Sequence, residues 1–204
     1  MDADAAGTAH RPTPGPLAAL VERIEDDARL DAPADAVARA LEPVLAHDGL
    51  RSALRGEWLG HAVHPLMTDV PIGTWLSAIL LDAAGGPRAR PAATALVGVG
   101  VAAAVPTALT GLAEWQATTG RARRVGLVHA AANVAGVLMF VVSLVARLFG
   151  RHRGGARAAL LGGAALSAGG YLGGHLSIAQ KVGTADPRWL ERTGAHVGEQ
   201  DPTA

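Results

Sequence analysis

The sequence predicts an all-α fold: an integral membrane four-helix antiparallel bundle with a short amphipathic helical N-terminal region. Two observations indicate this fold class. Four long apolar stretches follow one another after residue 65, and arginines are concentrated in the short segments that separate them. Half of the 204 residues are apolar while only 3% are aromatic, so alanine, leucine, valine and glycine would fill the helix contacts, as they do in membrane bundles.

The four apolar stretches have the length of membrane-crossing helices. They cover residues 66–84, 92–113, 125–146 and 158–180. About twenty apolar residues cross a hydrocarbon core of roughly 30 Å. The last three stretches lack the regularly spaced charges of a soluble amphipathic helix, so a soluble bundle is the less favoured alternative. In the last stretch, the spacings of Gly162 with Gly169, of Gly169 with Gly173 and of Gly170 with Gly174 predict close contact with a neighbouring helix.

The segments that flank these stretches are more polar. Residues 1–16 contain acidic residues and prolines and predict a disordered tail. Residues 17–57 place apolar side chains at helical spacing and predict two short amphipathic helices, the second broken or kinked at Pro43. These helices would pack on a partner surface or lie on a bilayer face; a soluble helical hairpin is the alternative. Residues 58–180 would then form the four-span domain, and residues 181–204 a polar C-terminal tail.

Composition excludes several classes of function. A chain without cysteine has no disulfide, no thiolate zinc site and no iron–sulfur cluster ligated by cysteine. The formal net charge is zero and no basic stripe carries interleaved aromatic residues, which argues against nucleic-acid binding. We find no convincing nucleophile triad and no phosphate-binding glycine loop. Whether the chain is an enzyme stays open at this stage.

Histidines from distant parts of the sequence meet at one depth if consecutive spans run antiparallel. We call the membrane face where the first span begins the near face, and the opposite one the far face. The alternation of spans predicts a polar layer close to the near face, made of His61, His64, Asp69, Glu114, His129, Asn133, Tyr171 and His175. Ionisable groups inside a membrane usually face the bundle interior and mark function.

Several chemistries fit such a histidine layer. Imidazole is the commonest metal ligand and also an axial ligand of haem iron. One interpretation is a haem b held by histidines from the set His61, His64, His129 and His175. A second is a metal ion held by His64, His129 and His175 with Glu114 or Asp69. A proton relay or quinone pocket and a purely structural hydrogen-bond network are further alternatives. Asn133 and Tyr171 would support the ligands from the next layer outward.

Four motifs carry a resemblance to a known family. The stretches GHAVHPLMTDVPIGTW, AAVPTALTGLAEW, VHAAANVAGVL and GGYLGGHLS occur in this order between residues 58 and 180. Together they resemble the bacterial membrane family catalogued as domain of unknown function 2231, which implies four spans and no assigned activity. Some actinobacterial relatives carry a Rieske iron–sulfur domain after the last span. This chain lacks that domain, so a redox role would need an intrinsic cofactor or a separate Rieske-type or other redox protein.

The sequence therefore favours a redox-linked component of the cell membrane, in contact with the lipid bilayer. The alternative is a non-catalytic membrane scaffold or anchor for a soluble redox partner, and either form could assemble as a homo-oligomer. Arginines and lysines near the spans are equally frequent on both faces, so the positive-inside rule gives no orientation. We expect a multi-pass protein with both termini in the cytoplasm, because an acidic N-terminal segment without a signal sequence is more simply left untranslocated.

Overall fold

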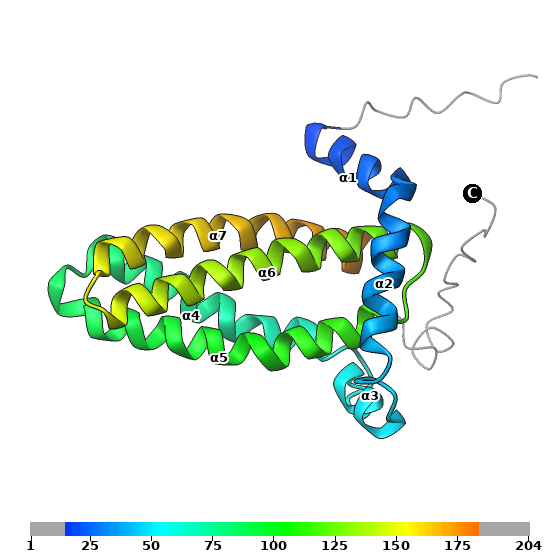
Figure 1. Ribbon diagram of the computed structural model, residues 1–204, viewed down its shortest axis with the longest axis horizontal. Coiled ribbons are helices and arrows are strands. Elements are labelled where there is room, and N and C mark those ends of the chain that lie inside the picture. The colour runs from blue at the N-terminus through cyan, green and yellow to red at the C-terminus, as the bar shows by residue number, and fades with distance from the viewer. Residues whose placement is uncertain (1–14, 184–204) are drawn as a thin grey trace, which may run out of the picture.

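The computed structural model describes residues 15–183, and this part of the chain is helical with no strand. Its helices are α1 (Pro16–Asp26), α2 (Asp31–Leu41), α3 (Asp48–Arg55), α4 (His64–Ala84), α5 (Arg90–Trp115), α6 (Gly120–Leu148) and α7 (His152–Gly174), which a π-helical turn (His175–Ala179) extends. The four long helices α4 to α7 lie along one axis, and α1 to α3 gather at one end (Figure 1). The all-α prediction is confirmed; the predicted tails lie almost entirely outside the described residues.

Three segments are long and apolar enough to cross a membrane. They are His64–Ala84, Pro87–Trp115 and Gly120–Leu148, which contain α4, α5 and α6. The fourth predicted span, α7, is not among them, because Arg153 and Arg157 near its start and its many glycines lower its mean hydropathy. Three candidate spans are therefore established, and the fourth stays a prediction.

Large apolar side chains cover the outside of the long helices. A soluble bundle would bury such side chains and place charged ones outside. Here the exposed set includes Ile72, Leu76, Leu80, Val105, Val134, Leu138, Leu160 and Leu161. The buried core contains many alanines, and many of the large aliphatic side chains lie on the outside instead. This distribution is typical of a protein solvated by lipid.

Proline and threonine join α4 to α5. Pro71 lies inside α4 and has no N–H, so the carbonyl of Met67, four residues earlier, loses its helical partner. The Thr107 hydroxyl of α5 donates a hydrogen bond to that carbonyl at 3.0 Å. A polar group that would otherwise be unsatisfied in an apolar environment thus fixes how the two helices meet.

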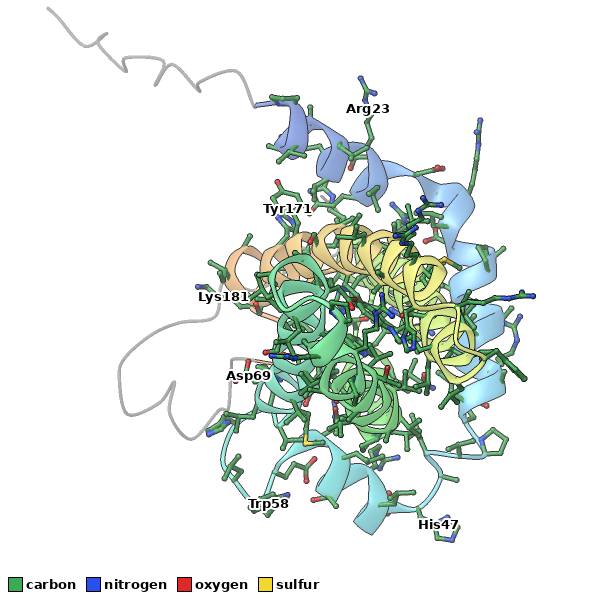
Figure 2. All side chains as sticks on the ribbon, turned by 90° about the vertical axis from the view of Figure 1, so that its left-hand side faces the viewer. Arg23, His47, Trp58, Asp69, Tyr171 and Lys181 are labelled. Atoms are coloured by element: carbon green, nitrogen blue, oxygen red, sulfur yellow. The ribbon has the colours of Figure 1, made fainter. Side chains whose placement is uncertain are left out.

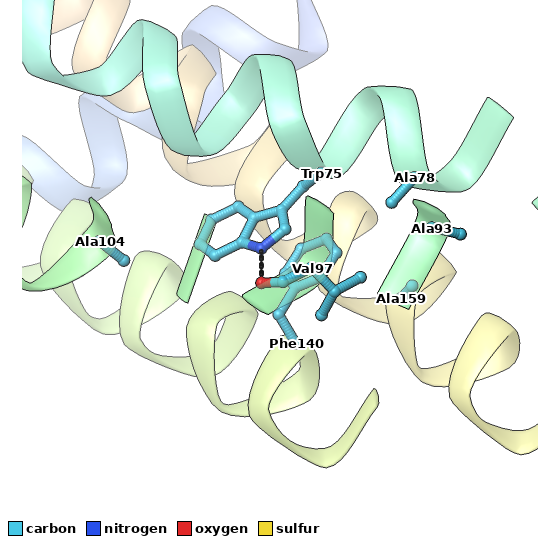
Figure 3. Close-up of a cluster of buried hydrophobic side chains, with 7 residues drawn as sticks. All are labelled: Trp75, Ala78, Ala93, Val97, Ala104, Phe140 and Ala159. Atoms are coloured by element: carbon cyan, nitrogen blue, oxygen red, sulfur yellow. Dashed lines mark hydrogen bonds between the residues drawn. The ribbon is translucent and has the colours of Figure 1, made fainter. Parts of the chain in front are cut away.

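Two stacked aromatic rings lie at the middle of the bundle. The rings of Trp75 from α4 and Phe140 from α6 are parallel, with centroids 4.2 Å apart. The indole N–H of Trp75 donates to the carbonyl of Val97 on α5 at 3.3 Å (Figure 3). Alanines and partly buried leucine, isoleucine and valine side chains pack around the rings, and the buried members of this core come from all four long helices.

The two helical hairpins α4–α5 and α6–α7 repeat one pattern of contacts. Three residues of α4 have counterparts 65 positions later in α6: His64 and His129, Trp75 and Phe140, Asp82 and Arg147. Three residues of α5 have counterparts 62 positions later in α7: Gly100 and Gly162, Thr107 and Gly169, Gly111 and Gly173. The counterparts make matching contacts. Gly100 lies against the Trp75 ring and Gly162 against the Phe140 ring, so close that a Cβ at either position would clash with the ring.

The N-terminal arm, residues 16–55, packs against the near end of the bundle, where α2 crosses the ends of the long helices (Figure 1). Its acidic residues pair with arginines at the start of α6, and the shortest contact joins Arg124 to Asp31 at 2.7 Å. This guanidinium holds the pKa of the Asp31 carboxyl below its ordinary value. The predicted amphipathic helices are present and α2 ends at Leu41, ahead of Pro43; α3 was not predicted. The arm, which was expected to pack on a partner surface or a bilayer face, packs on the helix bundle of its own chain.

Candidate functional site

His64 is the first residue of α4, and its imidazole lies on α5. The Nδ1 atom is 3.0 Å from the carbonyl oxygen of Thr107 and 3.1 Å from the hydroxyl of Thr110. A carbonyl oxygen only accepts, so Nδ1 carries the proton and Nε2 has a free lone pair. The ring lies against Gly111, where a Cβ would come within 2.7 Å of His64 Cε1. Only glycine leaves room for this ring position.

His129 of α6 has the same environment on α7. Its Nδ1 atom lies 2.7 Å from the carbonyl oxygen of Gly169, which again assigns the proton to Nδ1. A Cβ at Gly173 would come within 2.8 Å of His129 Cε1. Two contacts differ. Leu172 stands at the place equivalent to Thr110 and offers no hydroxyl, and Asn133 Nδ2 lies 3.0 Å from His129 Nε2 and donates to it. Asn133 therefore contacts the imidazole, as expected for a residue of the supporting layer.

The two imidazoles occupy equivalent places in the repeated hairpins. Each is held by a backbone carbonyl and a glycine of the following helix, four positions apart in both hairpins. Backbone carbonyls that fix the Nδ1–H tautomer are the usual outer partners of histidines that bind a metal or haem iron through Nε2.

His175 and His61 have different surroundings. His175 Nε2 lies 2.7 Å from Glu25 Oε1 of the N-terminal arm, and Gln180 contacts the same carboxylate oxygen at 2.5 Å. This histidine therefore joins the end of α7 to α1. His61 precedes α4, is exposed, and its Nδ1 lies 3.1 Å from the carbonyl of Ala62. Neither contact involves His64 or His129.

The remaining predicted site residues lie apart from the two imidazoles. Asp69 and Tyr171 are exposed, at the periphery of the bundle (Figure 2). Glu114 is half-buried at the end of α5, and its carboxylate lies beside Gly183. Among residues 15–183, no three histidine, aspartate or glutamate side chains are grouped closely enough to hold a metal ion.

One buried ion pair was missed by the sequence analysis. The Asp82 carboxylate accepts hydrogen bonds from both terminal nitrogens of Arg147, and the Arg147 side chain has no exposed surface. Arg147 Nε also donates to the Ser143 hydroxyl at 3.0 Å, and that hydroxyl donates to the Gly155 carbonyl. The pair joins α4 to α6 at the far end, and its two residues are counterparts in the repeat.

Comparison with known families matches these helices. Residues 60–186, more than half of the chain, match the family described as "Predicted membrane protein (DUF2231)". The chain belongs to this family. The match covers all four long helices of the DUF2231 protein and therefore both carbonyl-bound imidazoles. No curated protein and no solved structure matches the chain.

In this DUF2231 protein, the histidines were predicted from the sequence as candidate ligands, but the groups that hold their imidazoles were not. Thr107, Gly111, Gly169 and Gly173 were missed as imidazole partners. The predicted helix contact is confirmed for Gly162, Gly169 and Gly173, and it is wrong for Gly170 and Gly174, where a Cβ would meet no atom within 4 Å. The signal was present in the spacing. His64 and Trp75 are eleven residues apart, as are His129 and Phe140, and each hairpin continues with a glycine at the matching place.

Proposed function

We propose that this DUF2231 protein is a multi-pass protein of the cell membrane that holds a haem b through His64 and His129 and acts as a redox-linked membrane component. In this proposal α7 crosses the membrane with α4, α5 and α6. Residues 58–180 form the membrane domain, the arm covers its near end, and both termini are cytoplasmic. Protease accessibility of the N-terminus in inverted vesicles tests the orientation.

One observation carries the haem proposal: two equivalent imidazoles, each with Nδ1–H donated to a backbone carbonyl and each seated on a glycine. In each imidazole Nε2 is the unprotonated nitrogen, so His64 and His129 are the residues that would hold the haem iron. When bound, haem would supply reversible one-electron transfer. The carbonyls of Thr107 and Gly169 would hold the imidazoles in the ligating tautomer, and Asn133 would have to turn away from His129 Nε2.

His64 and His129 carry the haem proposal better than the wider set of histidines. His175 is engaged by Glu25, and His61 is exposed outside the helix. A bare metal ion is a weaker proposal for the same pair, because no three histidine, aspartate or glutamate side chains among residues 15–183 are grouped closely enough to hold one. A separate Rieske-type or other redox protein would then be the electron partner, and assembly into a homo-oligomer is compatible with this role.

The second candidate function is a membrane scaffold or anchor for a soluble redox partner, with the histidines as structural hydrogen-bonding groups. The contact between Asn133 and His129 Nε2 favours it, because that contact satisfies the second ring nitrogen without any ligand. The arm would then be the part that a soluble partner meets.

Absorbance of the purified full-length chain separates the two functions. Haem binding gives a Soret band that His64→Ala and His129→Ala both abolish, while the matched controls His61→Ala and His175→Ala keep it. A colourless protein after expression with added haem precursor contradicts the haem proposal and supports the scaffold. Loss of the band in only one of the two core variants contradicts the paired arrangement.

A further inference from the structure

The far end of the bundle has positive charge without a negative counterpart. Arg147 there is neutralised by Asp82. Five other arginines lie in or beside the connections α4–α5 and α6–α7, all are exposed, and none forms an ion pair within residues 15–183: Arg88, Arg90, Arg151, Arg153 and Arg157. At the near end, by contrast, the arginines at the start of α6 pair with acidic residues of the arm.

A groove of about 500 Å³ opens on the side of α6 at this same end. Arg151 lines the groove together with five apolar side chains, those of Val141, Val142, Val145, Ala146 and Phe149. Phe149 is 79% exposed and Val142 is 50% exposed, so these walls face the surroundings of the bundle. The groove therefore combines a long apolar surface with one cationic group at its end.

The charge and shape of this groove point to one ligand class. We propose that the groove binds an anionic phospholipid, with its phosphate at Arg151 and the upper part of an acyl chain along α6. The segment from Val141 to Phe149 spans eight helical steps, or about 12 Å, which suits an extended hydrocarbon chain parallel to the helix. Arginine forms strong charge-assisted hydrogen bonds with phosphate, and its apolar stem can lie along the same surface.

The surroundings favour a lipid over a peptide or a free anion. The groove lies on α6, one of the candidate membrane-crossing helices, and its walls are exposed sideways, where acyl chains are the neighbours. A free phosphate would use Arg151 and leave the apolar walls unoccupied. Basic residues at the end of a membrane helix attract anionic headgroups in this way.

Native mass spectrometry of the detergent-solubilised full-length chain tests the proposal. The protein is mixed with equal amounts of phosphatidylglycerol and phosphatidylcholine, with matching acyl chains, and the bound lipids are counted. We expect more phosphatidylglycerol than phosphatidylcholine on the wild type. Arg151→Gln should lower that preference about fivefold, since one arginine near an anionic surface contributes about that factor. Arg151→Lys should keep most of it.

Three controls make the result specific. Arg121→Gln removes an exposed arginine at the opposite end and should leave the preference unchanged. Val142→Trp fills the groove and should reduce retention of both lipids. Glycerol 3-phosphate carries the headgroup chemistry without chains and should not displace the lipid. Equal binding of the two lipids, an unchanged preference in Arg151→Gln, or displacement by glycerol 3-phosphate would each overturn the proposal.

Discussion

The buried ion pair between Asp82 and Arg147 gives the sharpest test of the repeated hairpins. Asp82→Asn removes the only carboxylate that faces Arg147 in the described part of the chain, yet keeps the volume of the side chain. The guanidinium is then left fully buried without a carboxylate, and it keeps hydrogen bonds only to Ser143 and to the single amide oxygen at position 82. Because the two positions are counterparts in the repeat, the exchange of both residues, Asp82→Arg with Arg147→Asp, should rebuild the pair in the opposite sense.

The expected size follows from the burial of the pair. The Arg147 side chain is 0% exposed and that of Asp82 is 14% exposed, so solvent screens neither group well. Removing one partner of such a pair costs about 3–5 kcal/mol. For a chain of this length that corresponds to a fall in melting temperature of about 6–20 °C. The double exchange should recover at least half of the loss; Ser143 supports only one of the two sites, so recovery should be incomplete.

Thermal unfolding in detergent, followed by circular dichroism, measures these changes. Arg88→Gln is the matched control, because this exposed arginine of the far end has no ion-pair partner in residues 15–183 and should leave the melting temperature unchanged. A melting temperature of Asp82→Asn within about 2 °C of the wild type would contradict a stabilising role of the ion pair, because such a shift corresponds to less than about 1 kcal/mol. So would a double exchange that is no more stable than Asp82→Asn alone.

Three further predictions concern the imidazole sites and the arm. Gly111→Ala should displace the His64 ring and weaken the haem Soret band, whereas Gly170→Ala, which meets no atom within 4 Å, should not; equal bands would refute the fitted position of the ring. Thr107→Val should lower the free energy of unfolding, measured by thermal unfolding, by about 1–3 kcal/mol because the Met67 carbonyl loses its donor. The hydrogen bond between His64 and the Thr107 backbone carbonyl persists in this variant. Thr94→Val is the control, because the Thr94 hydroxyl bonds only within its own helix. The folded protein has a lowered Asp31 pKa. The ion pair of Asp31 therefore stabilises arm docking fully at pH values above the ordinary Asp31 pKa of 3.8, and this contribution is lost as the pH falls through the lower pKa of the folded protein. Limited proteolysis of the arm should therefore accelerate in acid, and Asp31→Asn should be cleaved faster than wild type at pH 7 and differ little from it in strong acid.

The helices and the depth of the histidines could be predicted from the sequence. Long apolar runs define the helices, and alternation of direction brings His64 and His129 to the same end. Sequence periodicity could not tell which neighbouring helix each imidazole contacts, because that depends on the rotation of each helix. Glycine contacts such as Gly111 with His64 set that rotation, and they became recognisable only with both hairpins in view. His175 shares the depth but turns toward Glu25, a residue 150 positions away.

Charge partners were harder to predict than positions. Asp82 and Arg147 lie on helices α4 and α6, which are not packed neighbours, so their pairing needs two side chains that reach each other across the bundle. Helix α3 was missed because it is short and its sequence is strongly polar. Its end is defined by Gly56, whose φ of 73° allows the chain to turn back.

The opposite signs of Asp82 and Arg147 have a consequence for assembly. If two identical copies of the first hairpin met through this surface, two carboxylates would face each other, and two copies of the second would oppose two guanidinium groups. Both charges are neutralised only when a first hairpin, which carries Asp82, meets a second hairpin, which carries Arg147. The duplicated architecture thus discriminates against self-association of either half, which would favour correct intramolecular docking while the newly inserted hairpins are still free to meet neighbouring chains.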